Sequence, residues 1–302
     1  MIPPLIWVPV TFAASCAQVI RNGAQAHLTA RIGTLGATQV RFVFGLPFAA
    51  MFLVLYLAAS HEPIPVPDAR ALGWTALGAV CQIGGTALML VVMGQRAFGV
   101  AYAYIKTEPV IVAVLGAVVL GDRLPPLAWL AVVTVTAGVL VASVPPRDYR
   151  RLLGETRMIS AGIGAGALFG ISSIAFRGGI VATGSGSLVA RSLLVLAMTL
   201  ALQTVLLGAW LALRDRAAFA GSLREWRQSF GAGFAGALSS ALFFTAFALT
   251  PAANVRSFAL VELPIAALAS GRVTGRWLKP HELAGMAVIM AGVVALLVAQ
   301  AT

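Results

Sequence analysis

The chain has 302 residues, of which 60% are hydrophobic and 10% are charged. Soluble domains have about 45–50% apolar and about 25% charged residues, so this composition excludes a water-soluble globular protein. The 21 lysines and arginines outnumber the 10 acidic residues. Most of these cations lie in short segments between apolar runs, where basic residues set membrane orientation. We therefore expect an integral membrane protein in contact with the lipid bilayer, with no nucleic-acid partner.

Apolar runs bounded by charged or Pro- and Gly-rich segments predict an all-α protein with ten transmembrane helices. In chain order, these helices cover residues 3–22, 34–58, 71–93, 98–120, 127–144, 158–178, 186–213, 229–249, 253–271 and 281–300. The connections between them are short, so we expect any activity to reside within the bilayer or at its surface.

Basic residues are distributed unevenly over these connections. The connections after the first, third, fifth, seventh and ninth helices carry most of them, whereas the other four carry Arg70 and Arg123. Short loops rich in Lys and Arg stay on the cytoplasmic side. The charge distribution therefore predicts that both termini lie outside the cytoplasm.

The sequence contains an internal repeat. A shift of 154 residues lays residues 101–141 over 255–295, so that Glu108 falls on Glu262 and Gly138 on Gly292. This divides the chain into residues 1–146 and 147–302, with five predicted helices in each half. Because five is an odd number, the second half must enter the membrane from the opposite side. Such 5+5 inverted-topology repeats build transporters that expose a central site alternately to each side.

Several motifs of both halves resemble the drug/metabolite transporter superfamily, specifically its EamA-like ten-helix branch. The sequences GDRL at 121–124 and GRWL at 275–278 are similar to its G-E-R-L signature, and Glu108-Pro109 resembles an E-P element in its fourth helix. Arg41 and Arg191 resemble an arginine near the start of its second and seventh helices. The resemblance implies a transporter of the bacterial inner membrane, with its termini inside the cytoplasm.

Ionisable residues within the spans are candidate functional groups, because each costs roughly 2.5–3.5 kcal/mol to insert. Bases outnumber acids among them, which favours an anionic cargo. We expect cargo binding from Arg21, Gln82, Tyr102, Lys106, Arg177 and Arg256, and coupling or helix bracing from Glu108 and Glu262. Arg41 and Arg191 are expected to form structural ion pairs. These roles compete with helix packing, anchoring and interfacial snorkelling.

Ideal helix geometry separates some of these side chains. At about 100° per residue, Glu108 lies roughly 200° around the helix from Lys106, and Glu262 lies about 240° from Arg256. This geometry predicts that the members of each pair point in different directions. Lys106 would then line a central cavity with Tyr102 and Gln82.

The leading hypothesis is a secondary transporter, not an enzyme, that exports a small amino-acid-like or organic-acid metabolite, as the resemblance implies. Proton coupling or exchange would drive it. The alternatives are a membrane-embedded lipid-acting enzyme and a non-transporting scaffold. Residues 231–236 match G-x-G-x-x-G, but no strand precedes them as a dinucleotide site requires. We expect no cofactor and no metal, and the sequence leaves a monomer and a homodimer open.

Overall fold

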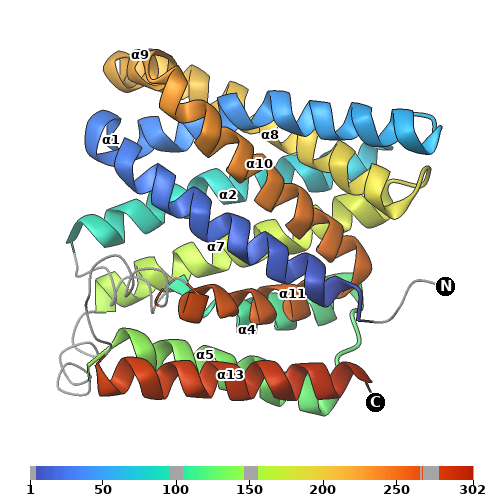
Figure 1. Cartoon of the computed structure of the whole chain (residues 1–302), viewed down its shortest axis with the longest axis vertical. Coiled ribbons are helices and arrows are strands. Elements are labelled where there is room, and N and C mark those ends of the chain that lie inside the picture. The colour runs from blue at the N-terminus through green and yellow to red at the C-terminus, as the bar shows by residue number, and fades with distance from the viewer. Residues whose placement is uncertain (1–4, 96–104, 146–155, 266, 268–278, 302) are drawn as a thin grey trace. The chain divides into compact units, whose positions relative to one another are not determined.

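The computed structural model describes residues 5–95, 105–145, 156–265, 267 and 279–301. Within these ranges the chain forms helices joined by short connections, with no β-strand (Figure 1). The elements are α1 (Trp7–Ser60), α2 (Ala69–Gln95), α4 (Glu108–Leu115), η1 (Gly116–Leu120), α5 (Pro126–Ser143), α7 (Thr156–Ala182), α8 (Leu188–Arg214), α9 (Arg216–Arg224), α10 (Trp226–Leu249), α11 (Ala252–Phe258), η3 (Ala259–Val261) and α13 (Pro280–Ala301).

Seven helices among the described residues are long and apolar enough to cross a membrane. They agree within a few residues with seven of the predicted spans, and they are Ile32–Ser60, Ala69–Met89, Pro126–Ser143, Ile159–Ala182, Leu188–Arg214, Ser229–Leu249 and Pro280–Ala301. The predicted helix 3–22 ends too early, because helical structure continues to Gly33. There φ is 72° and ψ is 170°, which divides α1 into two helices.

The predicted helices 98–120 and 253–271 are interrupted in their described parts. Lys106 and Thr107 form a turn before α4, and a 3-10 turn, η3, separates α11 from the helical residues 262–265. η1 is a single π-helical segment that continues α4 and ends at Gly121, whose φ of 69° is left-handed. Glycine adopts this conformation without steric cost and commonly ends helices in this way. Residues 98–104, 266 and 268–271 of these predictions lie outside the described residues.

Short polar side chains cap the helices at several connections. Asp68 accepts a hydrogen bond from the backbone N–H of Ala71 at the start of α2, and Ser187 accepts one from Ala190 at the start of α8. Asp215 accepts one from Ala218 and so begins α9, a short helix that hydropathy alone did not indicate. These caps satisfy N–H groups that have no partner inside the helix.

The chain divides into two compact units. Unit 1 comprises Met1–Phe12, Gly84–Ile174 and Thr250–Thr302, and unit 2 comprises Ala13–Ile83 and Ala175–Leu249. Each unit therefore contains segments from both of the predicted halves, 1–146 and 147–302. The candidate residues are distributed over the two units.

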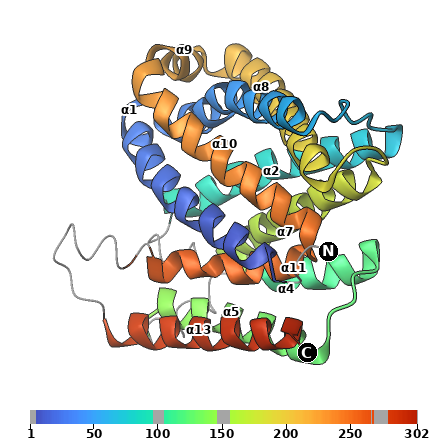
Figure 2. The same ribbon diagram turned by 45° about the vertical axis from the view of Figure 1, so that its right-hand side comes forward.

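Within unit 1, α5 and α13 pack tightly against each other and lie side by side in both views (Figures 1 and 2). A Cβ on Gly138 would lie 2.7 Å from the Ile289 backbone nitrogen, and one on Gly292 would lie 2.9 Å from that of Val135. A Cβ on Gly285 would collide with the backbone of Ala142. As α5 advances from Val135 to Ala142, its neighbour on α13 recedes from Gly292 to Gly285, so the two helices run antiparallel. Small residues allow this close approach in lipid, where apolar burial does not drive association.

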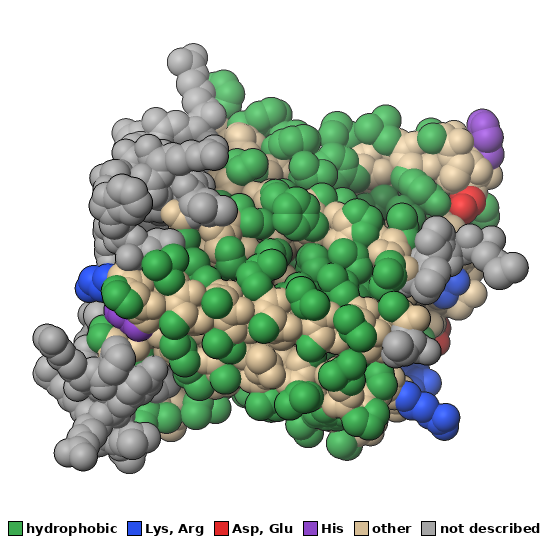
Figure 3. Space-filling model, turned by 60° about the horizontal axis from the view of Figure 1, so that its bottom comes forward, with side chains coloured by type: hydrophobic (Ala, Val, Ile, Leu, Met, Phe, Trp, Pro, Cys, Tyr) green, Lys and Arg blue, Asp and Glu red, His purple; other side chains and the backbone are tan. Residues whose placement is uncertain are grey.

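The face that carries α5 and α13 is covered mainly by hydrophobic side chains, and the charged side chains in view lie at its margins (Figure 3). Leu130 and Val133 on α5 and Val294 on α13 are more than half exposed. A soluble protein rarely exposes so large an apolar surface. This face is therefore suited to contact with lipid acyl chains.

Replacing Gly285 with alanine should destabilise unit 1, because the added Cβ forces α5 and α13 apart. Overpacking of this kind typically costs about 1–3 kcal/mol. Gly73→Ala on α2 is a matched control, because a Cβ at Gly73 meets no atom within 4 Å. We expect a lower Tm for purified Gly285→Ala and no loss for Gly73→Ala. Equal Tm values for the two variants would contradict the packing described.

Candidate functional site

Glu108, the first acidic residue within the spans, directly follows a break in the helix before α4. Ile105 is helical, Lys106 and Thr107 form the turn, and α4 begins at Glu108 with Pro109 in its first turn. Because proline has no backbone N–H, the helix cannot continue unbroken through this position with its full set of hydrogen bonds. The side chains of Lys106 and Glu108 therefore leave the backbone from two different local structures.

The second acidic residue follows a comparable break. α11 ends at Phe258, η3 covers Ala259–Val261, and helical structure resumes at Glu262, with Pro264 two residues later. Glu262 is also the residue that the 154-residue shift lays over Glu108. The two acids that this shift aligns thus both lie beside an interrupted helix.

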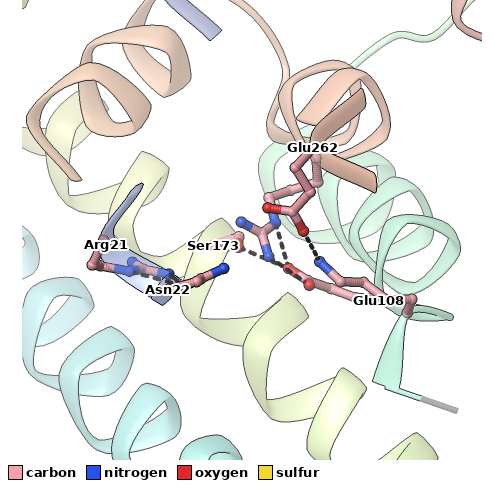
Figure 4. A network of polar contacts seen from close by, with 7 residues as sticks. Arg21, Asn22, Glu108, Ser173 and Glu262 are labelled. Carbon is pink, nitrogen blue, oxygen red and sulfur yellow. Dashed lines mark hydrogen bonds and ion pairs between the residues drawn. The ribbon is translucent and has the colours of Figure 1, made fainter. Parts of the chain in front are cut away.

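Arg256 on α11 binds Glu108 through two hydrogen bonds. Its Nε lies 2.6 Å from Oε1 of Glu108, and its Nη2 lies 2.6 Å from Oε2 (Figure 4). Ser173 on α7 also donates to Oε1 of Glu108, at 3.3 Å. The Glu108 side chain is 3% exposed. This bidentate arrangement matches the planar guanidinium to the carboxylate and is among the stronger types of protein hydrogen bond.

Lys106 forms the second ion pair. Its Nζ lies 2.7 Å from Oε1 of Glu262, whose side chain is 5% exposed (Figure 4). The two ion pairs are crossed, since each joins a residue of the first half to a residue of the second half. Glu108 and Arg256 are 148 residues apart in sequence, and Lys106 and Glu262 are 156 apart. All five polar residues of this network belong to unit 1.

The expectation that Lys106 diverges from Glu108, and Arg256 from Glu262, is wrong. The value of 100° per residue applies to a continuous helix, whereas a turn at Lys106–Thr107 and a 3-10 turn at Ala259–Val261 interrupt both helices. With these breaks, Arg256 reaches Glu108 and Lys106 reaches Glu262. Their four formal charges cancel, so the positive surplus of the spans lies elsewhere.

The remaining predicted bases with described side chains belong to unit 2. Arg21 donates from Nε and Nη2 to Oδ1 of Asn22, at 3.2 and 2.8 Å (Figure 4). Arg177 donates from Nη1 to the carbonyl oxygen of Phe247 on α10, at 2.5 Å. Arg191, near the start of α8, donates from Nε to the carbonyl of Gly186.

Arg41 and Gln82 also lie in unit 2. The guanidinium carbon of Arg41 lies 5.8 Å from the ring centroid of Phe42. Gln82 accepts a hydrogen bond from Nε2 of Gln203 on α8, at 2.7 Å. Tyr102 lies outside the described residues, so its expected place beside Lys106 and Gln82 stays a prediction. Among the described residues, His, Cys, Asp and Glu form no group of three that could hold a metal ion.

Comparison with known proteins identifies the family. Residues 7–144 match the EamA-like transporter family. This match over residues 7–144 places the protein in the drug/metabolite transporter superfamily. A solved crystal structure shares the fold of this EamA-like transporter, with a TM-score of 0.72 and 12% sequence identity, covering 98% of this chain and 99% of that one. The search of curated proteins found no match. The family match and the seven apolar helices together indicate a multi-pass membrane protein of a transporter family.

Two polar features of this EamA-like transporter were not recognised from the sequence. Ser173 joins the ion-pair network, and Gln203, which is 0% exposed, pairs with Gln82. The signal was present for Gln203, because a carboxamide within an apolar 27-residue helix needs a hydrogen-bond partner in lipid. Ser173 gave no such signal, since serine is common in membrane helices and can bond to its own backbone.

The Glu108–Arg256 pair should behave as one unit in a double-mutant cycle. Breaking a buried ion pair by removing one partner typically costs about 3–5 kcal/mol, whereas removing both leaves no uncompensated charge. We expect Glu108→Gln and Arg256→Gln each to lower the Tm of the transporter more than the double variant does. Arg123→Gln, in an exposed connection, serves as the control. Additive losses in the double variant would show that the two side chains do not interact.

Proposed function

We propose that this transporter is a secondary carrier that exports a small amino-acid-like or organic-acid metabolite across the bacterial inner membrane, by alternating access and with proton coupling or exchange. The observation that carries the proposal is the crossed network of Glu108–Arg256 and Lys106–Glu262 at two helix breaks. The metabolite class follows from the motifs that the chain shares with the EamA-like branch.

The four charged residues of the network would bring a free-energy cost and no benefit to a membrane protein that did not need charges in its spans. Each ionisable residue costs roughly 2.5–3.5 kcal/mol on insertion scales, and apolar residues of similar volume would often stabilise the fold as well or better. Interrupted helices in secondary transporters commonly supply the backbone and side-chain groups that bind substrates and coupling ions. Charges retained at two such breaks therefore favour a role in transport over one in stability alone.

The contacts between α5 and α13 support the inverted repeat that alternating access requires. Gly138 packs on Ile289, and Gly292 packs on Val135. The shift of 154 residues converts the first contact into the second, since it lays Gly138 over Gly292 and Val135 over Ile289. Reciprocal contacts of this kind are expected across a two-fold axis. An axis relating the two halves would allow two equivalent conformations from one sequence.

Glu108 and Glu262 are the proposed coupling residues. A proton on Glu108 would remove the charge that holds Arg256, and a proton on Glu262 would release Lys106. The same event would weaken attachment between α4 and α11 and expose a cationic group to an anionic cargo. Of the other candidate cargo residues, Arg21, Gln82 and Arg177 lie in unit 2.

Orientation can be tested separately from transport. The charge distribution predicts that the termini lie outside the cytoplasm, whereas the family resemblance implies the reverse, and we propose the former. Single-cysteine variants Pro63→Cys and Arg216→Cys, in a background without Cys16 and Cys81, place exposed thiols in the second and seventh connections. We expect a membrane-impermeant maleimide to label Pro63→Cys in intact spheroplasts and Arg216→Cys after lysis. The opposite pattern would place the termini inside.

Proton coupling can be tested in proteoliposomes with radiolabelled succinate and leucine. We expect at least one to exchange across the membrane and to accumulate when a pH gradient is imposed. Glu108→Gln and Glu262→Gln should lower gradient-driven accumulation at least tenfold while leaving more of the exchange, because the proton step is lost and cargo binding is not. Glu282→Gln is a matched control at the exposed start of α13, where a glutamine oxygen can still accept from the Lys279 N–H.

Flux that does not respond to a pH gradient or to a membrane potential would exclude proton coupling and leave exchange. Absence of any flux with both compounds, from correctly folded protein, would contradict the proposed cargo class. Equal losses in Glu282→Gln would show that the effect does not depend on the network.

A further inference from the structure

Ser173 on α7 is the uncharged member of the ion-pair network, and its hydroxyl group lies between two acceptors (Figure 4). Its Oγ lies 3.3 Å from Oε1 of Glu108 and 3.0 Å from the carbonyl oxygen of Phe169, one turn earlier on α7. Serine has a single O–H donor and two acceptor lone pairs. A well-aligned hydrogen bond therefore goes to Glu108 or to Phe169 at a given moment, and rotation of the hydroxyl group exchanges the two.

Small residues of α7 bring Ser173 within reach of Glu108. A Cβ on Gly166 would lie 2.6 Å from the carbonyl oxygen of Ile105, and one on Gly170 would lie 3.2 Å from a side-chain atom of α4. Gly166, Gly170 and Ser173 are four and three residues apart, so they share one face of α7. Ser173 and Glu108 are both buried, and each therefore depends on protein groups for its hydrogen bonds.

The charged partner of Glu108 is Arg256. The described ionisable side chains on the segments around Glu108 are Lys106, Asp122, Arg177, Arg256 and Glu262. Arg256 binds Glu108 directly, and Lys106 pairs with Glu262. Asp122 lies against Gly116, beyond the far end of α4, and Arg177 belongs to unit 2. While Glu108 is ionised, its carboxylate accepts from Arg256 and from Ser173.

A proton on Glu108 changes the hydrogen bonds that this residue requires. A carboxylic acid carries an O–H group, and a buried donor without an acceptor has a free-energy cost. Of the described residues that hydrogen-bond to Glu108, Arg256 cannot accept this bond, because a guanidinium group has donors only. Ser173 can accept it, since its own O–H can turn to Phe169 and leave a lone pair for Glu108. The hydroxyl group thus provides a hydrogen bond for either charge state.

We infer that Ser173 is a positioning residue for the proton step, which accepts a hydrogen bond from the protonated carboxyl group of Glu108 while donating to the carbonyl of Phe169. The proton comes from water, and Ser173 keeps its own proton throughout. The inference rests on the proposed function for the view that Glu108 takes up a proton during transport. It goes beyond that function by naming the group that receives the new O–H donor when Arg256 is released.

Infrared difference spectroscopy of the purified full chain in lipid nanodiscs tests this hydrogen bond without any cargo. Acidification produces a carboxylic C=O band for each acid that takes up a proton, and the band of Glu108 is the one that Glu108→Gln removes. A carboxyl group with fewer hydrogen bonds absorbs at a higher frequency. We expect the Glu108 band to move to higher frequency in Ser173→Ala and to return toward its original position in Ser173→Thr, which keeps the hydroxyl group.

Ser172→Ala is the matched control. Ser172 is buried on the same turn of α7, and its hydroxyl group donates to the same carbonyl of Phe169, at 2.8 Å. In proteoliposomes, Ser173→Ala should lower accumulation of succinate or leucine driven by a pH gradient at least about threefold and leave exchange in place. Ser172→Ala should change neither the band nor the accumulation. Size-exclusion profiles establish folding, and Ser173→Cys, whose thiol is a weak donor and acceptor, repeats the test if Ser173→Ala does not fold.

Three outcomes would overturn the inference. The first is that acidification produces no carboxyl band that Glu108→Gln removes. The second is an unchanged band in Ser173→Ala, or an equal shift in Ser172→Ala. The third is normal accumulation by Ser173→Ala where accumulation by the unaltered protein requires Glu108.

The two measurements separate this inference from the proposed function. A shifted band in Ser173→Ala without any flux in the unaltered protein would contradict the proposed cargo and leave the hydrogen bond in place. Gradient-driven flux in the unaltered protein with an unchanged band in Ser173→Ala would support the function and reject the role of Ser173.

Discussion

A charged side chain in the hydrocarbon of a bilayer is stable when an opposite charge or a bound ion lies beside it, and this electrostatic constraint organises the functional part of the protein. In unit 1 the constraint is met internally, because Arg256 binds Glu108 and Lys106 binds Glu262. In unit 2 the helices carry arginines without any acid in their own spans. The two units therefore differ in the charges that their own spans carry.

The residues that form the ion pairs lie beside irregular backbone, in the same unit as a closely packed pair of helices. Turns at Lys106–Thr107 and Ala259–Val261 leave main-chain groups outside the helical hydrogen-bond pattern, which lipid cannot satisfy. Such turns are tolerated where protein surrounds them. The close antiparallel contact of α5 with α13, made by Gly138, Gly285 and Gly292, belongs to the same unit.

Hydropathy alone predicted the seven apolar helices within a few residues, because lipid requires each span to be apolar over its whole length. It also identified Lys106, Glu108, Arg256 and Glu262 as exceptional, since charge within a span is conspicuous. It did not predict how they pair. The paired residues are 148 and 156 residues apart in sequence, so their pairing is set by tertiary structure. The angle between side chains that is calculated for a continuous helix does not apply where the helix is interrupted. Ser173 was missed for a related reason, because nothing local distinguishes it from other small residues of α7.

The division into two units has a consequence for biosynthesis. Neither unit can be completed from the first half of the chain, since unit 1 needs Thr250–Thr302 and unit 2 needs Ala175–Leu249. Glu108 leaves the ribosome 148 residues before Arg256. At about 5–20 residues per second, this delay lasts roughly 7–30 s. During that interval the first helices reside in the membrane with an acid and a base whose partners have not yet been made. The translocon, a chaperone or water must therefore accommodate these charges until synthesis of the second half brings Arg256 and Glu262 into the membrane.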